Sequence, residues 1–440
     1  MAERRPAGVM RLSPARLHRI VRCSIMPPMS VSPIPDASPG APALAVGPRQ
    51  RALILTGLSL GGFAIGTSEF ASMGLMPNMV AELGVSEPQV GHLISAYALG
   101  VVVGAPLLAI LGGRLSRKAL LLALMAFYAA GNLATALGPD YLSLMLFRFI
   151  AGLPHGAYFG VAALTAVAIT PPEARGRAVS LSMLGLTLAI LLGTPLATWM
   201  GQLASWRWTY AFVALVSLAT LTLLALYLPA NGKAPRTRVL DELRAFNRLP
   251  VWQGLLIGAI GFAGMFSVFS YLAPTMVQVT GVAPAWIPVG VAGFGLGGLI
   301  GNMVGGWLFD RLRFRAVPVV LGWALVMLLL FPLAAQAPWS LLLATVCIGA
   351  MGALGPILQS HLMDVAGEAQ TLAAASHHAA FNAANALGPL LGGMAISAGF
   401  GWTSTGPVGA IPAVAGIGLY LWAARTRARR LRAEACCPAA

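Results

Sequence analysis

Long apolar runs separated by short polar segments dominate the chain between residues 50 and 425. The first run extends from Ala52 to Pro77. A helix of this length reaches roughly 39 Å at ~1.5 Å per residue, more than the ~30 Å hydrocarbon core of a bilayer. The pattern predicts twelve transmembrane helices, near 53–77, 90–111, 119–137, 142–167, 178–199, 208–228, 251–279, 286–309, 317–335, 339–362, 372–398 and 404–424.

Composition agrees with a membrane-embedded chain. Of the 440 residues, 58% are hydrophobic and 9% are charged, against roughly 25% charged in a soluble domain. Twenty-six of the 28 lysines and arginines lie in the two tails and in alternate connections. By the positive-inside rule we expect both termini in the cytoplasm, and the dispersed basic residues argue against a nucleic-acid partner despite the net charge of +15.

The chain contains an internal repeat. A shift of 197 residues places equivalent residues of the second and eighth spans in register: Tyr97 with Phe294, Gly100 with Gly297, Gly104 with Gly301, Arg114 with Arg311, and Lys118 with Arg315. The repeat predicts two six-span halves joined by the longest polar connection. We expect a basic, disordered N-terminal tail at 1–50, a first bundle at 51–228, a cytoplasmic linker at 229–250, a second bundle at 251–424 and a C-terminal tail at 425–440.

One acid, Glu69, lies deep within the predicted spans. An ionised carboxylate at the bilayer centre costs about 2.5 to 3.5 kcal/mol even on the gentlest insertion scale, so Glu69 must face protein or water. Intramembrane acids usually mark ion or proton paths, although a structural acid neutralised by an internal arginine is the alternative. The rise of a helix places Glu69 ~12 Å and Arg148 ~9 to 10 Å below the outer ends of their spans, so the two could meet.

Two loops resemble the repeated cytoplasmic loop motif of the major facilitator superfamily. They are GGRLSRK at 112–118 and GGWLFDRLRFR at 305–315. The resemblance implies gating loops at Gly113, Arg114, Arg117, Asp310 and Arg311. The second copy keeps its acid, but Gly113 stands where the family usually has aspartate, which puts a charge-relay gate in the first half in doubt.

Further motifs lie in the fourth, fifth and eleventh spans. Arg148 followed by Gly152, Gly156 and Gly160 is similar to the superfamily's buried arginine above a glycine ladder, and i, i+4, i+7 spacing puts His155 on the face of Arg148. GTPLATWMG in the fifth span and ALGPLLGG in the eleventh resemble the Gly-Pro motif of drug:proton antiporters. We expect close helix packing at Gly152, Gly156, Gly193, Pro195, Gly388 and Pro389.

The sequences of the first, fourth and eleventh spans, which contain GTSEF, FRFIAGLPHGAYFG and FNAANALG, most resemble the sugar-efflux branch that includes arabinose efflux permeases. The resemblance implies an all-α fold of two pseudo-symmetric six-helix bundles, with spans 1, 4, 7 and 10 lining a central cavity. We expect proton coupling by Glu69 and Arg148. We expect a substrate cavity formed by His155, Met265, Phe269, Tyr271, Gln359, His378 and Asn382, with at most one of the adjacent His377 and His378 pointing inward.

Together with the buried acid Glu69, the resemblance implies a secondary active transporter that exports a sugar-like or amphiphilic molecule across a bacterial inner membrane by proton antiport. We expect no catalytic residues, metal or cofactor, and a monomer surrounded by lipid. Proton-linked uptake, passive facilitation and a non-transporting sensor remain alternatives. A membrane-embedded enzyme is disfavoured because neither an HExxH motif nor paired deep carboxylates occur.

Overall fold

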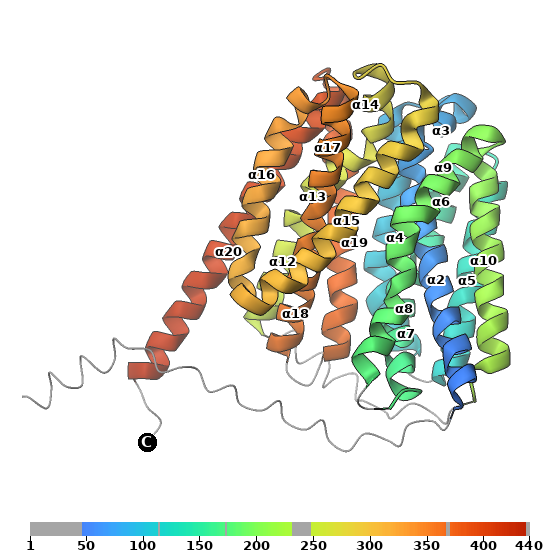
Figure 1. Ribbon diagram of the computed structural model, residues 1–440, viewed down its shortest axis with the longest axis vertical. Helices are drawn as coiled ribbons and strands as arrows, with labels where there is room; N and C mark the ends of the chain where they lie inside the picture. Colours follow the sequence, from blue (N-terminus) through green and yellow to red (C-terminus); the bar gives the residue numbers. More distant parts are fainter. Residues whose placement is uncertain (1–45, 113–114, 172–173, 231–247, 367–369, 437–440) are drawn as a thin grey trace, which may run out of the picture. The chain divides into compact units, whose positions relative to one another are not determined.

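The computed structural model describes residues 46–112, 115–171, 174–230, 248–366 and 370–436. The expected N-terminal tail, most of the expected linker, and the expected gating residues Gly113 and Arg114 lie outside these residues. The described chain is almost entirely helical (Figure 1). Eleven helical stretches are long and apolar enough to cross a membrane, and one of them, the 51-residue stretch Pro284–Ala334, holds two consecutive spans.

The first six spans form one bundle. They comprise α2 (Pro48–Gly74) with α3 (Met76–Leu83), α4 (Glu87–Gly112), α5 (Arg117–Leu137), α6 (Tyr141–Gly152) with α7 (His155–Ala168), α8 (Arg175–Leu188) with the π-helical turn η2 (Ala189–Gly193) and α9 (Thr194–Leu203), and α10 (Trp206–Tyr227).

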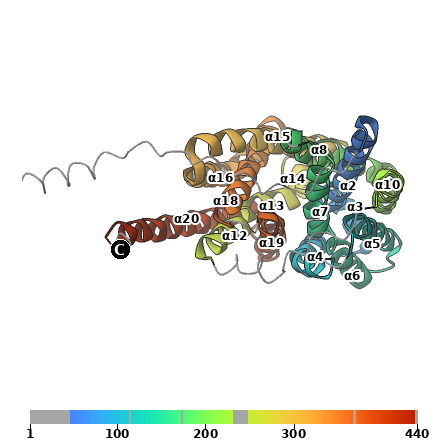
Figure 2. The same cartoon turned by 90° about the horizontal axis from the view of Figure 1, so that it is seen from below.

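The last six spans form the second bundle, which lies beside the first in Figure 2. They comprise α12 (Leu249–Gly261), α13 (Ala263–Ser270) and α14 (Leu272–Gln278), then η4 (Pro284–Trp286) with α15 (Ile287–Leu312), η5 (Arg313–Arg315) with α16 (Ala316–Ala334), α17 (Pro338–Gly349) with η6 (Ala350–Ala353) and α18 (Leu354–Ala366), α19 (Gln370–Ser397), and η7 (Trp402–Ser404) with α20 (Thr405–Cys436). The predicted fold class is confirmed. One span end differs, because α20 continues beyond residue 424 to Cys436.

Helix breaks concentrate in the spans expected to line a cavity. The first span is interrupted at Leu75, the fourth at Leu153 and Pro154, and the seventh at Phe262 and Tyr271. The tenth contains the 3-10 turn η6. Interrupted helices free backbone groups within the membrane, which is tolerated where they face protein or a cavity.

The internal repeat has a direct structural counterpart. A Cβ atom on Gly100 or Gly104 would clash with the carbonyl oxygens of Phe149 and Leu153, respectively. On Gly297 or Gly301 it would clash with the carbonyl oxygens of Val346 and Ala350, which are Phe149 and Leu153 shifted by the same 197 residues. The second and fourth spans, and the eighth and tenth, therefore approach each other closely through equivalent glycines.

The two bundles contact each other mainly along two seams of helices. Helix α4 packs against α19, and α15 packs against η2 and α9. Hydrogen bonds also cross between the bundles near these contacts: Ser95 Oγ donates to the carbonyl oxygen of Ala386 at 2.8 Å, and Gln202 Nε2 on α9 donates to that of Pro284 in η4 at 2.8 Å. We call the side with the basic segments 115–118, 174–177 and 311–315 the basic side, and the other the far side.

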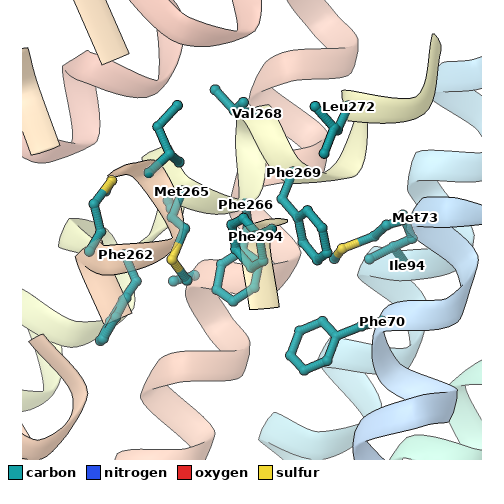
Figure 3. Packing of buried hydrophobic residues seen from close by; sticks show 14 of the residues in the cluster. Phe70, Met73, Ile94, Phe262, Met265, Phe266, Val268, Phe269, Leu272 and Phe294 are labelled. Carbon is teal, nitrogen blue, oxygen red and sulfur yellow. The ribbon is translucent and has the colours of Figure 1, made fainter. Parts of the chain in front are cut away.

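An apolar cluster joins the bundles towards the far side. Figure 3 shows Phe70 and Met73 from the first bundle near Phe266 and Phe269 from the second. The rings of Phe70 and Phe266 are parallel with centroids 6.4 Å apart, and Phe269 stacks on Phe294 at 3.6 Å. We call Phe70, Met73, Ile94, Phe266, Phe269, Leu272 and Phe294 the apolar seal. Their packing excludes water between the bundles at this level.

Candidate functional site

Glu69 lies at the contact between the two bundles. It is on α2, one residue before Phe70 of the apolar seal, and is 1% exposed. Its Oε1 accepts a hydrogen bond from Asn385 Nδ2 at 3.0 Å, and Asn385 belongs to α19 of the second bundle. The carboxyl group thus connects the bundles at a depth where an unpartnered charge is costly.

Arg148 is fully buried on α6, and its partners lie within its own bundle. Its Nη1 donates to Ser68 Oγ at 3.0 Å and its Nη2 to the Ser68 carbonyl oxygen at 3.1 Å. The guanidinium lies 4.3 Å above the ring centroid of Tyr97 and 5.2 Å above that of Tyr210. Among the described residues, the ion pair found joins Arg207 and Glu82, not Arg148 and Glu69. Arg148 therefore forms its hydrogen bonds with Ser68, the residue before Glu69, and not with Glu69 itself.

We expect Arg148→Lys to lower transport by roughly tenfold or more, because an ammonium group cannot donate to both Ser68 oxygens in this fork geometry while stacking on Tyr97. Arg49→Lys is the matched control, since Arg49 is exposed in the first turn of α2. Initial transport rates in proteoliposomes measure both variants. Equal rates for the two variants would contradict the assigned role of Arg148.

A row of polar groups leads from the surroundings of Arg148 towards the second bundle. Tyr97 Oη lies 3.0 Å from Tyr128 Oη and 3.1 Å from His155 Nδ1. The His155 ring centroid is 6.3 Å from that of His378, and Phe159 stacks on His378 at 5.1 Å. Arg148 and His155 thus both contact Tyr97, as expected for residues on one face of the fourth span.

A cavity of about 190 Å³ lies between the bundles on the basic side of the apolar seal. Aromatic and Met side chains form one part of its wall, and neutral polar side chains form another. No Asp, Glu, Lys or Arg occurs among the described residues that line it: Phe70, Leu186, Thr187, Ile190, Met265, Phe266, Phe294, Gly295, Gly298, Leu299, Asn302, Gly349, Gly352, Gly355, Pro356, Gln359, His377, His378 and Phe381. Such a wall suits an uncharged ligand with polar and apolar faces.

Three of the seven expected cavity residues, Met265, Gln359 and His378, line this cavity. Phe269 lies in the apolar seal instead. Tyr271 is also on the far side, where its hydroxyl donates to the carbonyl oxygen of Pro389 at 2.8 Å.

The other two expected cavity residues, His155 and Asn382, are buried outside the lining. Asn382 Nδ2 donates to the His378 carbonyl oxygen within α19. The expectation that only one of His377 and His378 points inward differs from the structure, because both contribute to the cavity wall. The wall is broad enough to receive side chains ~100° apart on α19.

The expected gating and packing residues occupy helix ends and contacts. Arg117 begins α5, and Asp310 and Arg311 are exposed in the last turn of α15. Gly193 ends the π-helical turn η2 and Pro195 follows in the first turn of α9. The remaining packing residues, Gly152, Gly156, Gly388 and Pro389, lie in α6, α7 and α19, and a Cβ atom on any of the three glycines would clash with a neighbouring helix.

Sequence reasoning missed several polar residues of the site. Ser68 stands beside Glu69 in GTSEF, and Asn385 stands in the FNAANALG segment that also holds Asn382. Asn132 accepts from Ser68 Oγ at 2.5 Å, and Asn302 lines the cavity. These residues could have been found from the sequence as neutral polar residues within apolar spans, especially those next to a buried acid.

The geometry defines a class: a membrane transporter with two bundles around a neutral central cavity. The family model of the Major Facilitator Superfamily matches residues 58–371 and 290–435. The chain belongs to this superfamily, and it is not an enzyme. It is 38% identical over 370 residues to Inner membrane transport protein YdhP of Escherichia coli (strain K12), covering 83% of this chain and 94% of that protein.

Two further similarities extend this result. The Chloramphenicol resistance protein of Streptomyces lividans is 34% identical over 342 residues, covering 74% of this chain and 85% of that protein. The crystal structure of a bacterial homolog of the human lysosomal transporter Spinster, inward-facing and occupied, superposes with a TM-score of 0.70 at 17% identity. That alignment covers 87% of this chain and 98% of the other. At this identity the second similarity concerns the fold alone.

Proposed function

We propose that this transporter exports a small, uncharged amphiphilic molecule by exchange for protons, with Glu69 as the proton carrier. The observation that carries the proposal is the burial of Glu69 at the contact between the bundles, one residue before Phe70 of the cavity wall. A group placed there becomes accessible first from one side of the membrane and then from the other when the bundles rock about the cavity. Its proton can therefore be taken up on one side and released on the other.

The composition of the cavity supports the proposed substrate class. Aromatic rings on Phe70, Phe266, Phe294 and Phe381 offer flat apolar faces, and amide, imidazole and hydroxyl groups offer hydrogen bonds. A sugar or a neutral drug has both kinds of surface. The names of two relatives, an inner membrane transport protein and a chloramphenicol resistance protein, support a transported molecule of this kind. The distribution of Lys and Arg supports a cytoplasmic basic side with both termini there.

Flux into proteoliposomes tests the proposal with arabinose, uridine, chloramphenicol and the cation tetraphenylphosphonium as labelled compounds. A proton antiporter concentrates its substrate inside when the lumen is acidic, whichever way the protein is inserted. We expect a neutral compound to accumulate under this gradient and the cation not to. Accumulation only with an acidic exterior would indicate proton symport. Flux that neither gradient affects would indicate a passive facilitator. The absence of specific flux would indicate a non-transporting sensor.

A further inference from the structure

We propose that Asn385 is a positioning residue that stabilises the ionised Glu69 carboxylate only while the bundles are closed on the far side. This inference rests on the proposed function of Glu69. It assigns the coupling between proton release and bundle movement to one hydrogen bond between α2 and α19.

The hydrogen bond is the link to Glu69 that depends on conformation. Arg148 and its partners Ser68, Tyr97 and Tyr210 all lie in the first bundle, so they move together with Glu69. Asn385 lies in the second bundle and separates from Glu69 when the far side opens. A hydrogen bond to a charged group favours the charged form. Closure of the far side therefore favours loss of the proton, while the cavity lies on the basic side.

Among the described residues, the Asn385 side chain makes its hydrogen bond to Glu69 and to no other group. The residue is 0% exposed, and within the described part of the chain its Oδ1 has no hydrogen-bond partner. After rotation of the amide, this oxygen can accept a hydrogen bond from a protonated Glu69. The bond to a neutral carboxyl is weaker than the bond to a carboxylate, so the contact responds to the charge of Glu69.

The charged and titratable groups around Glu69 do not duplicate this response. Arg148 on α6 acts electrostatically on Glu69, the ring of Tyr97 on α4 lies against Arg148, and Tyr128 on α5 contacts Tyr97. All three belong to the first bundle. His378 on α19 faces His155 rather than Glu69. Phe266 and Phe269 on α13 contribute rings next to Phe70 and no ionisable group.

The far-side separation of the bundles provides a readout that needs no substrate. Spin labels on Leu137→Cys at the end of α5 and Phe400→Cys after α19 report it, because both positions are exposed on the far side. Distances are measured by pulsed electron paramagnetic resonance on the full chain in lipid nanodiscs at acidic and alkaline pH. The native cysteines are first replaced by serine, at Cys23, Cys347, Cys436 and Cys437.

Asn385→Leu keeps the approximate size of the side chain and removes the donor. We expect it to raise the ratio of open to closed far side roughly tenfold at alkaline pH, and much less at acidic pH, because the lost bond is strong only to a charged partner. Ser95→Ala is the matched control, since it removes a different hydrogen bond between the bundles, from α4 to α19, that has no ionisable partner. Its effect should be the same at both pH values.

Asn385→Gln keeps the amide donor and should recover part of the pH dependence. An effect of Asn385→Leu that is equal at both pH values, like that of Ser95→Ala, would overturn the inference and leave Asn385 a structural contact. Glu69→Gln distinguishes failure of the inference about Asn385 from failure of the proposed role of Glu69. If the ratio of open to closed far side loses its pH dependence in Glu69→Gln but keeps it in Asn385→Leu, this inference alone is refuted. If the ratio keeps its pH dependence in Glu69→Gln, the proposed role of Glu69 is refuted as well.

Discussion

We expect proteoliposomes containing Glu69→Gln to accumulate no substrate above the level of protein-free liposomes when the lumen is made acidic. Glutamine has nearly the size of glutamate and can still accept a hydrogen bond from Asn385 through its amide oxygen, so the contact at 3.0 Å between α2 and α19 is retained. The side chain can no longer gain or lose a proton. Counterflow of labelled against unlabelled substrate at equal pH, which moves no net proton, should stay within about threefold of the unmodified protein, a change of under 1 kcal/mol.

A matched control distinguishes the position of the acid from the loss of any acid. Glu82 is 40% exposed on the far side, where its Oε1 accepts from Arg207 Nε at 2.6 Å. Exposed ion pairs contribute little, so Glu82→Gln should retain proton-driven accumulation. Undiminished proton-driven accumulation by Glu69→Gln would remove Glu69 from the mechanism.

We expect Gly152→Ala to destabilise the first bundle severely, although it adds only one methyl group. The added Cβ atom would clash with the carbonyl oxygen of Tyr97, a backbone atom of α4 that cannot move away as a side chain would. The fourth and second spans would have to separate, which disturbs the contact of Arg148 with Tyr97. Overpacking of this kind costs typically 1 to 3 kcal/mol and occasionally more, and we expect about 3 kcal/mol here because the obstacle is backbone.

Gly160→Ala provides the comparison in the same glycine ladder. A Cβ atom on Gly160 would meet no described atom within 4 Å. Alanine also favours the helix over glycine by about 1 kcal/mol. Thermal unfolding of both purified variants, followed by size-exclusion chromatography, should show a large fall in the unfolding midpoint for Gly152→Ala and none for Gly160→Ala. A midpoint for Gly152→Ala at or above that of Gly160→Ala would contradict the packing account.

Features that follow from local periodicity were predictable from the sequence. The apolar runs predicted where the transmembrane helices lie, because a helix in a membrane must satisfy its own backbone hydrogen bonds over the thickness of the bilayer. The repeat indicated that Gly100 and Gly297 are equivalent, and they indeed pack on carbonyl groups related by the same shift. The rise per residue placed Arg148 and Glu69 at similar depth, and the structure brings Arg148 against the neighbouring Ser68.

Contacts between the bundles were not predictable in the same way. Asn382 and Asn385 are both buried on α19, but one donates to its own helix and the other reaches Glu69. The difference depends on how α19 is rotated against α2, which no periodicity along a single helix specifies. Likewise, an aromatic residue such as Phe269 can line a cavity or close it. Its place in the apolar seal depends on which side of the bundles is closed.

Proton release on substrate binding tests the exchange of proton for substrate at Glu69 most directly. The purified protein is held in a weakly buffered solution with a pH indicator, and the best-transported compound of the flux panel is added. Binding should release protons from the unmodified protein and none from Glu69→Gln, at equal occupancy of the cavity by the labelled compound. Equal proton release from the two proteins would contradict the account.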